Sequence, residues 1–150
     1  MNQEYMNLAF EYANKALLKG EVPVGAVIVK NNKVIACAYN EKESKNDVLA
    51  HAELLAIKEA EKKFNNWRLE DCEIYVTLEP CPMCASAIKQ ARISKVYAAV
   101  NNSDQENSKL VEKIFSKADS TNPKVEYHSD LYVEKSRNLL DSFFKKQRQK

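Results

Sequence analysis

Two cysteines three positions apart, Cys81 and Cys84, lie in the segment PCPMC at residues 80–84. A pair with this spacing can form a disulfide, act as a redox couple, or supply half of a metal site. A redox couple needs only its two thiols, whereas a catalytic metal site needs three protein ligands and one position left open for water. The rest of the chain must decide between these interpretations.

A candidate third ligand stands thirty positions before Cys81, where His51 opens the segment HAE at residues 51–53. His51, Cys81 and Cys84 together offer one nitrogen and two thiolate sulfurs, which are ligands that zinc prefers. Glu53 lies in the same helical turn as His51, so its carboxylate can move a proton between an attacking water and a leaving nitrogen. The pattern predicts a zinc site with these three ligands and with Glu53 as the catalytic residue.

The other histidine and cysteines receive no chemical role. Cys37 and Cys72 lie in apolar, strand-like segments, where a free cysteine behaves as a small buried hydrophobic residue. His128 lies in a polar segment with no partner motif, so we expect it to be structural or exposed. Taken alone, His51 would suit an ordinary helix end and Glu53 a first-turn acid. Their order together with PCxxC favours the metal site.

The elements that must position these residues follow from apolar periodicity and turn residues. Helical spacing predicts helices over about 2–19, 50–64 and 82–92, a shorter one at 110–115, and a terminal helix with a buried face made by Leu139, Leu140, Phe143 and Phe144. Apolar runs predict strands at 26–29, 34–39, 74–78, 96–100 and 124–128. Both ligand segments fall at helix starts, where unpaired N–H groups and the helix dipole favour a thiolate.

Strands that alternate with helices predict an α/β fold, a three-layer α/β/α sandwich around a central mixed sheet of about five strands. The first two strands, joined across Asn31 and Asn32, should form an antiparallel hairpin, and the later strands should be mostly parallel. The chain has 150 residues, a usual length for one domain, so we treat 1–150 as a single domain.

Composition and charge limit the classes of partner. No apolar run approaches the length of a membrane span, so we expect no membrane insertion. The N-terminal segment is polar and acidic where a signal peptide would be basic and then apolar, which favours a cytoplasmic location. The net charge of +2 neither requires nor excludes nucleic acid, and the basic run KKQRQK at 145–150 suits a solvated helix as well as a binding role.

Several segments carry a resemblance to a known family. The order H-x-E…P-C-x-x-C is the signature of zinc-dependent deaminases. The other matching segments are EVPVGAVIV (21–29), Asn40, AHAE (50–53), NWRL (66–69), YVTLEPCPMCASA (75–87), RISKV (92–96) and FFKKQR (143–148). Over nearly its whole length the chain resembles the bacterial tRNA-specific adenosine deaminases of the cytidine deaminase superfamily. EVPVGA and TLEPC favour this branch over the related guanine and cytosine deaminases.

The resemblance implies a cytidine deaminase-like fold and the hydrolysis of adenosine to inosine at the wobble position of a tRNA anticodon. It also implies a homodimer with one zinc per subunit. An unpaired anticodon base costs little to splay into a pocket, which fits the predicted chemistry.

The same resemblance implies particular substrate contacts. Asn40 would hydrogen-bond the flipped base, and the backbone around Ala52 would help to hold it. RNA contacts are implied for Phe144, Lys145 and Arg148, although a phenylalanine at helical spacing from Leu139 and Leu140 more often belongs to a core than to a surface on which bases stack.

One segment departs from the family. After the strand at 96–100 the family usually has an aspartate and a basic, glycine-rich loop, whereas this chain has NNSDQENS at 101–108. Asn101 stands at the place of that aspartate, where an acid can accept a hydrogen bond from a ribose 2′-hydroxyl. Asn101 can still accept through its carbonyl oxygen, so it is kept as a substrate-binding candidate.

Two other functions stay open at this point. The changed loop at 101–108 supports a deaminase of a free base or nucleoside such as guanine or cytosine. The other open function is a zinc-stabilised RNA-binding module that does not catalyse a reaction. A structural zinc site usually has four protein ligands, however, and it would not need a carboxylate such as Glu53 beside only three ligands.

Overall fold

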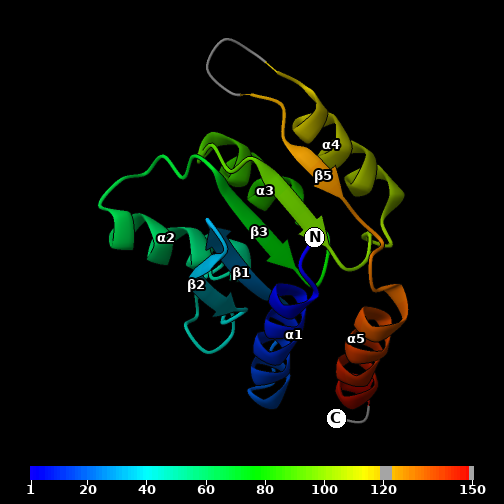
Figure 1. Cartoon of the computed structure of the whole chain (residues 1–150). Coiled ribbons are helices and arrows are strands. Elements are labelled where there is room, and N and C mark those ends of the chain that lie inside the picture. Colours follow the sequence, from blue (N-terminus) through cyan, green and yellow to red (C-terminus); the bar gives the residue numbers. More distant parts are fainter. Residues whose placement is uncertain (119–122, 149–150) are drawn as a thin grey trace.

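The computed structural model describes residues 1–118 and 123–148, so the last two residues of the basic run 145–150 lie outside it. In chain order the elements are α1 (Gln3–Leu18), β1 (Gly25–Lys30), β2 (Lys33–Tyr39), α2 (Ala52–Phe64), β3 (Cys72–Val76), α3 (Pro82–Gln90), β4 (Lys95–Ala98), α4 (Gln105–Ser116), β5 (Glu126–His128) and α5 (Val133–Arg148). Figure 1 shows the strands as one sheet with helices on both faces. This arrangement confirms the predicted α/β class.

The five strands lie in the order β2-β1-β3-β4-β5. β1 pairs antiparallel with β2 and β3, whereas β3 with β4 and β4 with β5 are parallel pairs. The β1–β2 turn has Asn31 and Asn32 at φ 50° and 60°, the left-handed backbone that a two-residue hairpin turn requires. The predicted antiparallel hairpin and later parallel strands are both confirmed.

The sheet separates two apolar clusters. On one face α2, α3 and α4 pack against β-strand side chains that include Ile74 and Val76. On the other face α1 and the beginning of α5 pack around Tyr75 and Tyr97. Because successive strand residues point to opposite faces, the apolar run in β3 serves both clusters. The sheet is therefore covered on both sides, as the uninterrupted apolar strands predicted.

A glycine allows α1 to approach β1 closely. A Cβ on Gly25 would lie 2.0 Å from the carbonyl oxygen of Ala9, so no larger residue fits without moving the helix. The N–H of Gly25 also donates a hydrogen bond to Thr77 Oγ1 at 3.1 Å. These contacts fix the segment 21–24, which enters the sheet beside the end of β3.

The terminal helix α5 corrects one prediction. The four apolar residues that were predicted to make its buried face do not form one: Phe144 is 50% exposed, and Leu139, Leu140 and Phe143 are only half-buried. The buried residue of α5 within its described part is Ser136. The helix packs on the α1 side through its first turns, where the Lys135 ammonium lies 4.5 Å from the Phe10 ring centroid, and the remainder extends away from the sheet (Figure 1).

Membrane insertion was not expected. No helix in the described part of the chain is both long enough and apolar enough to cross a bilayer.

Candidate metal centre and active site

Three ligand atoms converge where α2 and α3 begin. His51 and Cys81 are the N-cap residues of these helices, and Cys84 lies in the first turn of α3. The His51 Nδ1 atom lies 3.9 Å from Cys81 Sγ and 3.5 Å from Cys84 Sγ. Tetrahedral zinc bonds of about 2.0 Å to nitrogen and about 2.3 Å to sulfur set a nitrogen–sulfur separation of about 3.5 Å. The three residues therefore fit a single metal ion.

Local structure explains why these atoms meet. β3 delivers the chain to Pro80 and Cys81, and Pro82 then occupies the first turn of α3, where its fixed φ favours a helix and its missing N–H is not needed. α2 packs beside α3, which brings the two helix starts together. Unpaired N–H groups at these starts carry partial positive charge and stabilise thiolates.

Without a metal, the thiol of Cys81 loses its proton more easily than the thiol of Cys84. The hydrogen bond from Cys84, opposed by partial burial and assisted by His51, lowers the pKa of Cys81 to about 4. The same hydrogen bond and burial raise the pKa of Cys84, and a hydrogen bond with Cys81 raises the pKa of His51. Because metal ligands must be deprotonated, metal binding at this site has to release protons.

Glu53 lies beside this group without belonging to it. Among the described residues the candidate metal group consists of His51, Cys81 and Cys84 alone. The Glu53 side chain is 4% exposed, and this burial, reinforced by the nearby Cys81 thiolate, raises the pKa of Glu53 to about 7. A carboxyl group with such a pKa can both accept and donate a proton near neutral pH.

A pocket of about 290 Å³ opens beside the ligands. His51, Cys81 and Glu53 all line it, so a metal held here would face the pocket with its remaining position. The other lining residues are Gly20, Glu21, Val22, Val24, Asn40, Lys42, Glu43, Leu78, Glu79, Asn102 and Phe143. The arrangement brings together three candidate metal ligands, a carboxyl group that can transfer protons and a cavity for a small planar group.

Comparison with known proteins places the chain in a family. The MafB19-like deaminase family matches residues 1–148. The tRNA-specific adenosine deaminase of Aquifex aeolicus (strain VF5) is 43% identical, over 99% of this chain and 97% of that protein. The chain belongs to the tRNA-specific adenosine deaminases.

Solved structures of other deaminases have the same fold as this chain. A chain from work on A-to-I editing by tRNA:A34 deaminases at the wobble position of transfer RNA has a TM-score of 0.75 and 38% identity, with 84% of this chain and 96% of that chain covered. A guanine deaminase from Bacillus subtilis has a TM-score of 0.65 and 31% identity, with 100% of this chain and 96% of that chain covered. The predicted cytidine deaminase-like architecture is thus shared with relatives of more than one deaminase group.

Asn40, which the family resemblance predicts to contact the base, lines the pocket. Its Oδ1 accepts a hydrogen bond from the backbone N–H of Ala52 at 2.8 Å. The Nδ2 group of Asn40 is therefore the part that can donate to a base. Ala52 itself is fully buried and its N–H is already engaged, so any contact with the base would have to come from other backbone atoms nearby.

Asn101 does not line the pocket, whereas its neighbour Asn102 does. The backbone N–H of Asn101 donates to Asp130 Oδ1 at 2.8 Å. Its side-chain Oδ1 is buried and has no hydrogen-bond partner among the described residues. The role of Asn101 in substrate binding stays a prediction.

Helix α5 carries the candidate RNA-binding residues and also one residue that lines the pocket. Phe144, Lys145 and Arg148 are exposed and lie outside the pocket, while Phe143 lines it. The two phenylalanine rings pack edge to face with centroids 5.3 Å apart. Sequence periodicity alone could not assign one ring to the pocket and the other to the surface.

Two buried glutamates were not anticipated as part of the site. Glu21 and Glu79 are 1% and 2% exposed, and both line the pocket. Glu79 accepts hydrogen bonds from the Tyr127 hydroxyl and, at 3.3 Å, from the N–H of Asn102. The signal available in the sequence was an acid within an otherwise apolar segment, in EVPVGA and in TLEPC.

Proposed function

We propose that this chain catalyses the zinc-dependent hydrolytic deamination of adenosine to inosine at the wobble position of a tRNA anticodon. The observation that carries the proposal is the convergence of His51, Cys81 and Cys84 beside a pocket that also contains the buried Glu53. One nitrogen and two sulfurs favour zinc, and three ligands leave the open position that a catalytic site requires. Membership of the tRNA-specific adenosine deaminases supports the substrate.

The reaction replaces the amino group at C6 of adenine by an oxygen from water and releases ammonia. Zinc, when bound, supplies the activation of the attacking water. Glu53 accepts a proton from that water and delivers it to the departing nitrogen, which its pKa of about 7 allows in both directions. The Asn40 amide and the apolar walls at Val24 and Leu78 hold the base and exclude bulk water.

A single-stranded anticodon loop suits this pocket. An unpaired base can leave its stack at small cost and enter an enclosed site, and neighbouring bases can stack on exposed aromatic rings. α5 offers such a surface, because Phe144 and the basic residues Lys145 and Arg148 lie just beyond the pocket residue Phe143.

Family resemblance also leads us to propose a homodimer in the cytoplasm, with one zinc per subunit and tRNA as the partner. The assembly is tested by light scattering during gel filtration. A homodimer gives a mass twice the 17.1 kDa of one chain. A mass of one chain at micromolar concentration would contradict the dimer but leave the chemistry in place.

Deamination of free guanine is the second candidate. The 31% identity with the guanine deaminase from Bacillus subtilis favours it, as does the changed loop at 101–108. The EVPVGA and TLEPC segments and the basic end of α5 favour the tRNA substrate instead.

A substrate panel separates these functions. Zinc-loaded protein is incubated with an anticodon stem-loop and, separately, with guanine, cytosine, adenosine and cytidine, and the products are separated chromatographically. We expect inosine from the stem-loop and no conversion of the free compounds. Conversion of guanine alone would establish the second candidate, and a zinc-bound protein that releases ammonia from none of them would be a non-catalytic module.

A further inference from the structure

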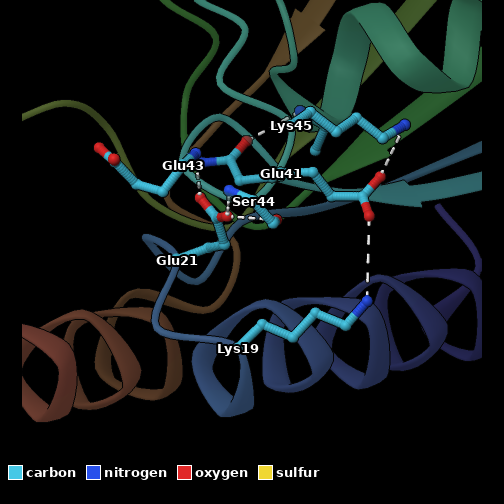
Figure 2. A network of polar contacts seen from close by, with 8 residues as sticks. Lys19, Glu21, Glu41, Glu43, Ser44 and Lys45 are labelled. Carbon is cyan, nitrogen blue, oxygen red and sulfur yellow. Dashed lines mark hydrogen bonds and ion pairs between the residues drawn. The ribbon is translucent and has the colours of Figure 1, made fainter.

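A buried carboxylate holds the loop 41–47 against the body of the protein. Figure 2 shows Glu21, which follows α1, directed into this loop from below. Its carboxylate accepts hydrogen bonds from the N–H of Glu43 at 2.9 Å, the N–H of Ser44 at 2.7 Å and the hydroxyl of Ser44 at 2.6 Å. Glu21 is 1% exposed, so these three donors replace the water molecules that would hydrate its carboxylate in the unfolded chain.

The carboxylate is charged when it makes these bonds. Burial acts to raise the pKa of Glu21, but the hydrogen bonds from Ser44 and Glu43 outweigh it and hold the pKa below the ordinary value. Hydrogen bonds to an ionised acceptor are shorter and stronger than bonds between neutral groups. Glu21 is therefore a strong attachment between the loop and the end of α1.

The other polar contacts of the loop are internal, lie at the surface, or join its two ends to Ala50: the N–H of Glu41 donates to the Ala50 carbonyl at 3.0 Å, and the N–H of Ala50 donates to the Asp47 carbonyl at 3.1 Å. Within it, the N–H of Lys45 donates to the Glu41 carbonyl at 2.9 Å, and the N–H of Asp47 donates to the Lys42 carbonyl at 3.0 Å. The ion pairs of Glu41 with Lys45 at 3.1 Å and with Lys19 at 4.0 Å lie at the surface, where such pairs contribute little. These bonds shape the loop and join its ends to Ala50, and Glu21 attaches the middle of the loop to the segment after α1.

The loop forms part of the pocket wall. Lys42 and Glu43 line the pocket next to Asn40. Of the two lysines in the loop, Lys45 is paired with Glu41, whereas Lys42 is exposed and has no ion pair within the described part of the chain. The loop thus presents one unpaired ammonium group at the rim.

The charge of the pocket indicates what the Lys42 ammonium group can bind. Four glutamates, Glu21, Glu43, Glu53 and Glu79, line the pocket. Those that are ionised repel phosphate, so a neutral base can enter while its flanking phosphates stay outside. The ammonium group of Lys42, a compact positive charge at the rim, can bind such a phosphate.

We propose that Glu21 is a positioning residue that holds the loop 41–47 as a wall of the pocket, so that Lys42 contacts a phosphate of the RNA strand beside the target base. The inference rests on the proposed function, because it requires a single-stranded polynucleotide as substrate.

The salt dependence of KM for an anticodon stem-loop tests this contact. Loss of one phosphate contact to a single strand lowers the slope of log KM against log salt by about 0.7, so over a fourfold rise in salt KM increases about 2.6-fold less. We expect this loss in Lys42→Gln and in Glu21→Gln, with kcat within about twofold of the parent value. The double variant should lose no more slope than Lys42→Gln alone.

Glu41→Gln is the matched control, because it removes the surface ion pairs of the same loop but leaves the Glu21 carboxylate bound. It should keep the parent slope. If Glu21→Gln fails to fold, as judged by thermal melting, Ser44→Ala takes its place, because it removes only the hydroxyl donor; its slope should fall between those of the parent and Lys42→Gln.

The outcomes separate this inference from the function beneath it. A parent protein that does not deaminate the stem-loop contradicts the proposed function. An active parent whose Lys42→Gln variant, or whose folded Glu21→Gln variant, keeps the full salt slope overturns only the inference about the loop.

Discussion

At the scale of single residues, the site concentrates four ionisable side chains at two helix starts. Without a metal, Cys81 carries the negative charge, Cys84 keeps its proton, and Glu53 is partly protonated near neutral pH. A dication bound by His51 and the two sulfurs would compensate the accumulated negative charge, and bound cations of this kind dominate the local electrostatics. Binding and catalysis can therefore be separated by substitution.

Glu53→Gln tests the proton transfer. The amide keeps the shape of the side chain but cannot carry the proton, so kcat/KM on an anticodon stem-loop should fall by about 10²–10⁴-fold while the zinc content is unchanged. Glu59→Gln, an exposed position on the same helix, should retain parent activity. Parent-like turnover by Glu53→Gln with zinc bound would remove Glu53 from the mechanism.

Cys84→Ala tests the metal group. Two remaining ligands cannot hold the ion as three do, so bound zinc measured by mass spectrometry should fall from about one per chain to near zero. Cys37→Ala is the control, because Cys37 lies in β2 and outside the candidate metal group. Retention of stoichiometric zinc by Cys84→Ala would show that the ion is held elsewhere.

At the scale of elements, segments far apart in the chain make the walls of the pocket. The residues after α1, the loop 41–47, the segment after β3 and the helix α5 all contribute. These walls are attached by a few polar contacts, such as the bonds to Glu21 and the hydrogen bond from Ser136 to the Thr77 carbonyl. Local substitutions should therefore change substrate binding more than the fold.

Phe144→Ala tests the outer surface of α5. Stacking of a base on an aromatic ring contributes about 1–3 kcal/mol, so KM for the stem-loop should rise by about fivefold or more. The melting temperature should hardly change, because Phe144 is 50% exposed. Leu110→Ala, a similarly exposed position on α4, provides the comparison. An unchanged KM in Phe144→Ala would remove this ring from the RNA surface.

Glu21→Gln tests the loop attachment by its pH dependence. Hydrogen bonds hold the pKa of Glu21 below its ordinary value of 4.5, so its contribution to stability is fully present above about pH 4.5 and is lost as the pH falls through the folded-state pKa. Loss of the charged acceptor should lower the free energy of unfolding by about 1–3 kcal/mol at pH 7. In urea titrations this difference from the parent should shrink below pH 4.5; a difference independent of pH would contradict the assignment.

At the scale of the whole molecule, the sequence predicted the parts that depend on local pattern. His51, Cys81 and Cys84 lie at or near the starts of two helices, and this placement limits which side-chain atoms can bind one ion. The apolar strands predicted a mixed sheet with helices on both faces. The left-handed turn at Asn31 and Asn32 is equally local. These features were predictable because neighbouring residues determine them.

The features that escaped prediction depend on tertiary packing. Helical periodicity placed Phe143 and Phe144 together in a core, yet α5 extends beyond the sheet, so one ring lines the pocket and the other faces solvent. The substrate candidate Asn101 and the lining residue Asn102 differ by one position in a loop without periodicity. The burial of Glu21 by donors from another loop leaves no pattern in the sequence beyond its apolar neighbours.

Inosine analysis of total tRNA tests the central claim most directly. Zinc-loaded protein and its Glu53→Gln variant are incubated with unmodified total tRNA, and the digested nucleosides are quantified and mapped. The account predicts inosine at the first anticodon position of tRNA treated with the parent, and background levels with the variant. Absence of inosine with the zinc-loaded parent, or equal inosine from both proteins, would contradict it.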